Sequence, residues 1–138
     1  MWIQGGLIAG NQKGSRRERS RVKVLEESFP FIPETHLFYS RKKADRFIRE
    51  RVDKIPRFIG SSAQTWCDGG VAVVLMSCES NWSTELALLC HEAYHVVSMH
   101  YGYLGEESPS DEFVAYGIQV VAKALFEAHA RRRGGWER

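Results

Sequence analysis

The sequence has few cysteines, no long apolar run and almost no net charge. Its three cysteines are an odd number and include no Cys-x-x-Cys pair, so we expect free thiols in a reducing compartment rather than a disulfide framework. No stretch approaches the roughly 18 apolar residues of a membrane span. The start of the chain has no charge before its short apolar piece, which does not fit a signal peptide. We therefore expect a cytoplasmic protein without a membrane partner.

The net charge of +2 is too small to indicate nucleic-acid binding by itself. Basic residues nevertheless gather near the two ends of the chain, from Lys13 to Arg21 and from Arg131 to Arg133. They are either solvated ends or contacts for nucleic acid or an acidic partner. The clusters alone do not decide between these interpretations.

The 138 residues, 43% of them hydrophobic, suffice for one domain with a real core. Residues 1–21 are rich in glycine and end in the basic cluster, so we interpret them as a loosely held N-terminal arm or, alternatively, a poorly packed first element. We expect residues 22–138 to form a single domain.

Alternating β formers predict a strand at Thr35–Ser40, and apolar residues at helical spacing predict a helix from Arg41 that Pro56 ends. The Asp68–Gly70 turn between two β-like runs predicts a hairpin. The second run, Val71–Met76, is almost entirely apolar and should lie centrally in the sheet.

Two helices follow the hairpin in the expected fold. The first should be capped by Ser83 or Thr84 and run to about His100. The second should begin with Ser108 as its N-cap and Pro109 in its first helical position, and end near the three arginines at residues 131–133. The order of elements predicts an α+β fold, with a small sheet and its hairpin against an antiparallel pair of helices.

The first of these helices contains the sequence His-Glu-Ala-Tyr-His, which is a His-Glu-x-x-His motif. His91 and His95 are four residues apart and lie on one helix face, where two imidazoles can share a tetrahedral zinc ion. Glu92, about 100° further round the helix, can act as general base toward a zinc-activated water without being a ligand. The apolar surroundings favour this interpretation, because burying three such side chains without a shared purpose is costly.

A catalytic zinc site of this kind needs a third protein ligand. An antiparallel helix pair would bring the second helix back toward the motif, so Glu112 is our first candidate and Glu107 the next. Asp111 fits a helix cap or a support for a ligand imidazole better. Tyr116 lies one turn beyond Glu112 and either stabilises an oxyanion or packs with a wet hydroxyl. His100 is rotated away from the histidine pair.

The stretches "LALLCHEAYHVV" and "LGEESPSDEFVAYGIQ" resemble the zincin metallopeptidases, and in particular small single-domain zincin-like proteins often encoded by phages and prophages. The resemblance covers residues 35–125 and is most specific at the motif. It implies a zincin-like fold, with His91, His95 and Glu112 as zinc ligands and Glu92 as general base. It also implies a peptide or protein substrate and, for a phage-encoded protein, the host cytoplasm.

Three functions follow as hypotheses. The first is a zinc metallopeptidase in which the strand nearest the motif binds an extended substrate. The second is a non-catalytic zinc-containing binding or regulatory module. The third, ranked last because it leaves the histidines unexplained, is a metal-free protein that binds nucleic acid through its basic ends.

Overall fold

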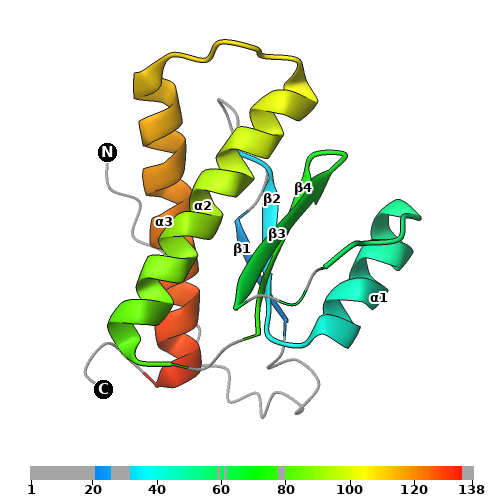
Figure 1. Cartoon of the computed structure of the whole chain (residues 1–138), viewed down its shortest axis with the longest axis vertical. Helices are drawn as coiled ribbons and strands as arrows, with labels where there is room; N and C mark the ends of the chain where they lie inside the picture. Colours follow the sequence, from blue (N-terminus) through cyan, green and yellow to red (C-terminus); the bar gives the residue numbers. More distant parts are fainter. Residues whose placement is uncertain (1–20, 26–31, 59, 61, 78–79, 135–138) are drawn as a thin grey trace, which may run out of the picture.

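The fold is described from a computed structural model, which covers residues 21–25, 32–58, 60, 62–77 and 80–134. This part of the chain forms an α+β structure of four strands and three helices (Figure 1). In chain order the elements are β1 (Arg21–Leu25), β2 (Glu34–Phe38), α1 (Arg41–Val52), β3 (Ala63–Asp68), β4 (Val71–Met76), α2 (Trp82–Leu104) and α3 (Asp111–Arg133).

The strands form one mixed sheet in the order β1-β2-β4-β3. The expected hairpin is confirmed: β3 and β4 are antiparallel, and the turn between them uses positive φ angles at Gly69 and Gly70. Such angles are accessible to glycine at little cost and suit a tight hairpin. β4 lies between β3 and β2, and it pairs with β2 in parallel. The predicted central position of Val71–Met76 is therefore also confirmed.

Strand β1 was not expected. It pairs antiparallel with β2 and its register shifts between Lys23 and Leu25. Its first residue, Arg21, falls inside the segment interpreted as an arm, so at least this residue of the segment belongs to the sheet. Residues 1–20, which make up the rest of that arm, lie outside the described residues.

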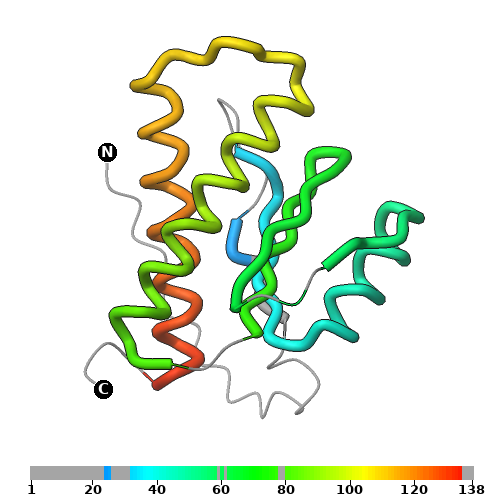
Figure 2. The backbone as a smooth tube through the Cα atoms, viewed as in Figure 1, coloured from blue at the N-terminus to red at the C-terminus, as the bar shows by residue number. Residues whose placement is uncertain are grey.

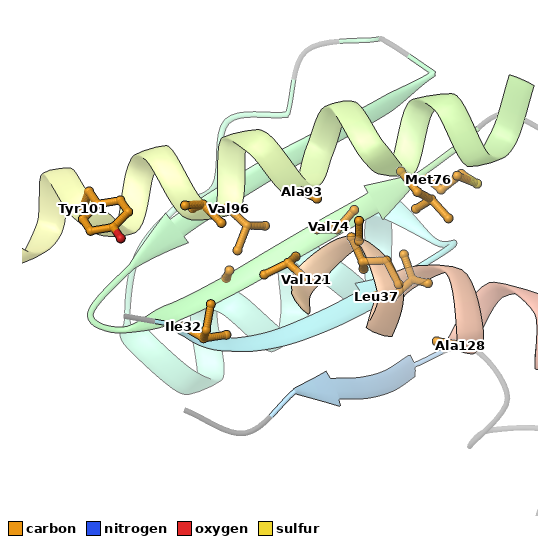
Figure 3. Close-up of a cluster of buried hydrophobic side chains, with 14 residues drawn as sticks. Ile32, Leu37, Val74, Met76, Ala93, Val96, Tyr101, Val121 and Ala128 are labelled. Atoms are coloured by element: carbon orange, nitrogen blue, oxygen red, sulfur yellow. The ribbon is translucent and has the colours of Figure 1, made fainter. Parts of the chain in front are cut away.

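The helices lie on opposite faces of the sheet, with α1 on one side and the α2–α3 pair on the other (Figure 1). The central strand β4 contributes to both cores. Ala72, Val74 and Met76 face the larger cluster under α2 and α3 (Figure 3), whereas Val71, Val73 and Leu75 face the smaller cluster under α1. The period-2 alternation of a strand therefore accounts for an apolar run that is buried on both faces.

Two helix boundaries differ from the prediction because the local caps lie elsewhere. Helix α1 ends at Val52, where Asp53 adopts a left-handed conformation as the C-cap, and not at Pro56. Helix α2 begins after Asn81, whose side chain accepts a hydrogen bond from the Thr84 amide, so neither Ser83 nor Thr84 is the cap. Asparagine is as good an N-cap as serine, and the sequence offered several candidates side by side.

The observed ends of α2 and α3 at their connection also differ from the prediction. α2 continues through Gly102 to Leu104 and is capped by Gly105, past the expected end near His100. α3 begins after Ser110, whose hydroxyl accepts from the Phe113 amide, and not after Ser108. Its C-terminal end, with three arginines before Gly134, is as predicted.

The two long helices run antiparallel and diverge toward their connection (Figure 2). Gly117 of α3 lies against Val97 of α2, where an added Cβ would be 3.1 Å from the nearest valine methyl carbon. This contact sets which residues of the two helices lie at the same level. Among the described residues, no helix is both long and apolar enough to cross a membrane.

Candidate functional site

The histidine pair of the motif forms as helical spacing predicts. His91 and His95 lie on α2, and their Nε2 atoms are 3.0 Å apart. Two nitrogens that each bind a tetrahedral zinc ion at 2.0–2.1 Å would be roughly 3.3 Å apart. His91 is exposed and His95 is half-buried, so a ligand can approach the pair from solvent. The two imidazoles therefore fit two positions of a zinc ion.

Glu92 follows His91 in α2 and is almost completely buried, with 3% of its surface exposed. The hydroxyl of Thr65 on β3 donates a hydrogen bond of 2.6 Å to its Oε2 atom. A buried carboxylate without a partner would be costly, and this bond engages one of its two oxygens. The contact also fixes Glu92 against the strand nearest the motif.

That strand is an edge of the sheet. β3 pairs with β4 on one side, and within the described part of the chain no strand pairs with its other side. α2 packs across β3, and the Thr65 hydroxyl also lies 3.4 Å from the Glu92 carbonyl oxygen. The histidine pair, the buried carboxylate and an open strand edge thus occur together.

Helix α3 packs against the face of α2 that carries Val97. Each residue of an α-helix is rotated by about 100° from the last, so the direction of His91 and His95 is about 140° from that of Val97. Val97 is the residue that meets Gly117 of α3. The pair therefore points away from α3, which was expected to supply the third ligand.

The levels along the helices separate Glu112 from the pair as well. Glu112 precedes Gly117 by five residues and His95 precedes Val97 by two, so their levels differ by about 10 Å along the antiparallel axes. Glu112 is exposed in the first turn of α3, and Glu107 is exposed in the connection. Tyr116 is 63% exposed, also on α3. The structure does not bring these three residues to the histidines.

No group of three or more His, Cys, Asp or Glu side chains placed to hold a metal occurs in the part of the chain that the structure describes. The donor set at the motif is thus two imidazoles, with Glu92 nearby but held by Thr65. His100, which the sequence excluded by rotation, is buried on a different face of α2.

A second polar cluster was missed by the sequence analysis. His129 of α3 lies between Tyr39 and Glu85: its Nδ1 is 2.7 Å from the Tyr39 hydroxyl and its Nε2 is 2.9 Å from a Glu85 carboxylate oxygen. Arg133 pairs with the same oxygen of Glu85. His129 and Glu85 are both buried. Because 44 residues separate them, only the packing of α2 on α3 reveals the pair.

The contacts of this cluster indicate a structural role, because they hold three elements together. Burial raises the pKa of Tyr39, which makes its hydroxyl a poor nucleophile or base. The His129 ring stacks with those of Tyr39 and Trp82, with centroid distances of 5.8 and 5.4 Å, and both of its nitrogens already have partners. The network joins the end of β2, the start of α2 and the end of α3.

Cys67 and Cys90 are free, as the odd cysteine count led us to expect, and Cys78 lies outside the described residues. Burial, together with the charge of Asp68, raises the pKa of the Cys67 thiol to about 11. A thiol with such a pKa is almost fully protonated at neutral pH and reacts slowly. Cys67 packs against the larger core cluster, which accounts for its presence.

Comparisons with known proteins do not extend this picture. No protein-family model matches the sequence, and no match was found among curated proteins or solved structures.

Proposed function

We propose that the chain is a zinc-dependent metallopeptidase of the zincin-like type, with His91 and His95 as metal ligands and Glu92 as general base. One observation carries the proposal: two imidazole nitrogens lie 3.0 Å apart on α2, and the residue that follows His91, Glu92, is a buried carboxylate hydrogen-bonded to an edge strand. Each feature has an ordinary structural explanation alone. Their combination matches the needs of metal-assisted hydrolysis.

A bound zinc ion would act as a Lewis acid that lowers the pKa of a water to roughly 7. The two histidines would hold it as neutral imidazoles through Nε2. The carboxylate of Glu92 would accept the proton of the attacking water and pass it to the leaving amine. Thr65 would keep that carboxylate oriented by its 2.6 Å hydrogen bond to Oε2, which leaves Oε1 for the proton.

The substrate class follows from the strand. The outer side of β3 offers backbone donors and acceptors to an extended peptide, which would add to the sheet as a further strand. A peptide held there would cross α2 at the level of Thr65 and Glu92, where the two elements touch. We therefore propose a peptide or protein substrate bound in extended form, and a cytoplasmic setting of the phage-encoded kind that the motif resemblance implies.

Glu112 lies in the first turn of α3, at a different level from the histidine pair. For Glu112 to complete the zinc site, the first turns of α3 would have to move by about 10 Å along the axis and pass to the other side of α2. The proposal of hydrolysis therefore rests on the two histidines and Glu92, while the role of Glu112 is a separate question with its own test.

The test is zinc content beside hydrolysis of an unfolded protein such as denatured casein. The native chain should bind zinc, His91→Ala should lose it, and Glu92→Gln should keep it while losing hydrolysis. Glu112→Gln and Glu107→Gln, each compared with Glu50→Gln on α1 as the control, should lower zinc affinity only where the replaced carboxylate is a ligand. Hydrolysis by Glu92→Gln at the native rate would refute the mechanism.

The rival function, a zinc-containing binding module, is favoured by one observation, the absence of a third ligand beside the pair in the described residues. It predicts zinc binding that stabilises the fold without any hydrolysis. Zinc raising the melting temperature of both the native chain and Glu92→Gln, with no cleavage by either, would support that function instead.

A further inference from the structure

The end of the helix pair carries an exposed apolar surface that the proposed site does not use. We call residues 99–116, which span the end of α2, the connection and the start of α3, the tip. Its large apolar side chains are 40–63% exposed: Met99, Tyr103, Leu104, Phe113 and Tyr116. Single exposed apolar residues are ordinary, but a group of them on one end of the molecule indicates a binding surface. Aromatic residues are the type most enriched where proteins bind one another.

The tip is also uniformly acidic. Four exposed carboxylates lie within it, those of Glu106, Glu107, Asp111 and Glu112, and no lysine, arginine or histidine occurs from Tyr101 to Ala122. The tip therefore has a net charge of −4 in a chain whose net charge is +2. Its occupant should be cationic and should also carry apolar side chains.

One segment of this chain has both properties. Residues 1–20 contain four basic residues and one acidic residue, a net charge of +3, together with an apolar start, Met-Trp-Ile, and the later pair Leu7–Ile8. Sequence alone left the basic cluster either solvated or in contact with nucleic acid or an acidic partner. The acidic, apolar tip supplies such a partner within the same molecule.

We propose that the tip is the docking surface for residues 1–20 of the same chain. The segment is attached at Arg21, the first residue of β1, and its length allows this contact. Arg21 pairs with Phe38 of β2, and through β4 the same level of the sheet reaches Gln64 of β3, next to Thr65. From the neighbouring level of Glu92 to the end of α2 is about 18 Å. Twenty extended residues reach up to about 65 Å, so the segment spans this distance with slack.

The charge of the tip disfavours other occupants. Nucleic acid and anionic membrane surfaces would be repelled, and so would the tip of a second copy. Attachment to β1 keeps the segment at a high effective concentration near the tip, which favours its own chain over a free partner. Charge brings the segment to the tip, and the apolar side chains give the contact area.

A spin label placed on the segment tests the contact. Gln4→Cys would carry the label in a full chain whose native cysteines, Cys67, Cys78 and Cys90, are replaced by serine. The amide signals of Tyr103, Gly105 and Phe113 should lose most of their intensity, while those of Arg46 and Arg49 on α1 should not. Intensity should return in high salt, which screens the charges.

Matched variants separate specific docking from general attraction. The triple change Glu106→Gln, Glu107→Gln and Asp111→Asn should restore the tip signals, and so should Trp2→Ser with Ile3→Ser. The control, Asp45→Asn with Glu50→Gln and Asp53→Asn, changes the net charge equally on the α1 side and should leave the broadening intact.

Three outcomes would overturn the inference. The first is a tip whose signals are unaffected by the label, and the second is broadening that the control variant relieves as fully as the tip variant does. The third is broadening that appears only when labelled and unlabelled chains are mixed, which would assign the contact to a second copy. None of these readouts depends on zinc or hydrolysis, so their results do not bear on the proposed peptidase function.

Discussion

Glu92 is the residue whose environment most restricts what the motif can do. It is buried between α2 and β3, yet its carboxylate is held by a neutral hydroxyl, and no lysine, arginine or histidine of the described residues forms an ion pair with it. Hydrogen bonds to charged groups contribute about 1.5–3 kcal/mol, roughly twice the value for neutral pairs. Thr65 is therefore the side chain on which the buried charge of Glu92 depends.

Thr65→Val should lower the free energy of unfolding by about 1.5–3 kcal/mol, because it leaves the Glu92 carboxylate buried without that donor. Valine has nearly the shape of threonine, so the loss would report the hydroxyl and not the packing. Urea unfolding at neutral pH measures it. Thr65→Ser, which keeps the hydroxyl, is the matched control and should lose less.

A Glu92→Leu background completes this test. With no carboxylate to hold, Thr65→Val should cost little there, and the difference between the two backgrounds is the coupling of the pair. Equal losses in both backgrounds would mean that the threonine acts through its own packing.

At the scale of elements, the junction of α2 and α3 depends on Glu85. Burial alone would raise the pKa of this carboxyl, but the hydrogen bond from His129, the bond from the Ser80 amide and the charge of Arg133 outweigh it, so its pKa is lowered from 4.5. A carboxyl whose pKa is lower in the folded state contributes stability above its unfolded pKa. That contribution is lost as the pH falls through the folded value.

The melting temperature should therefore fall as the pH is lowered below about 4.5, the ordinary pKa of a glutamate. Glu85→Gln should melt lower at neutral pH and show a flatter acid dependence, because it cannot be protonated. Glu50→Gln, on the exposed side of α1, is the control and should keep the acid dependence of the native chain. An unchanged dependence in Glu85→Gln would show that other carboxyls govern acid unfolding.

Local signals predicted the elements well, but not how the helices meet. The hairpin turn at Gly69–Gly70 and the His91–His95 pair each depend on neighbours within a few residues, and both appear as expected. The level of Glu112 depends on the contact of Gly117 with Val97, 20 residues away in sequence. Periodicity says nothing of that register. The choice of Glu112 assumed only that an antiparallel pair brings the second helix back toward the motif, and it could not include the level at which the helices meet.

Gly117 offers a direct test of what sets the register. Gly117→Val should destabilise the chain by about 1–3 kcal/mol, because the space at its Cβ is already filled by the methyl groups of Val97. Gly102→Val is the control: it lies in α2 with open space around its Cβ, so it should cost little. Val97→Ala should recover part of the loss in Gly117→Val. Equal costs at Gly117 and Gly102 would mean that helix packing is not responsible.

At the scale of the whole molecule, one sheet separates two cores. The residues of β4 alternate between them, so the smaller cluster under α1 and the larger one under α2 and α3 share a strand but no side chains. A single domain of this kind should unfold in one step, because neither cluster has its own sheet. Distant sites on either side should nevertheless contribute independently.

Ile48→Val in the smaller core should cost about 0.5–1.5 kcal/mol and Leu125→Ala in the larger core about 2–5 kcal/mol, since both side chains are fully buried. The double variant should lose the sum to within about 0.5 kcal/mol, because the sheet lies between the two sites. Urea unfolding followed by both fluorescence and circular dichroism measures it, and the two probes should give coincident transitions. Separate transitions, with Ile48→Val shifting only one of them, would contradict a single domain and assign α1 and its core to a unit that unfolds by itself.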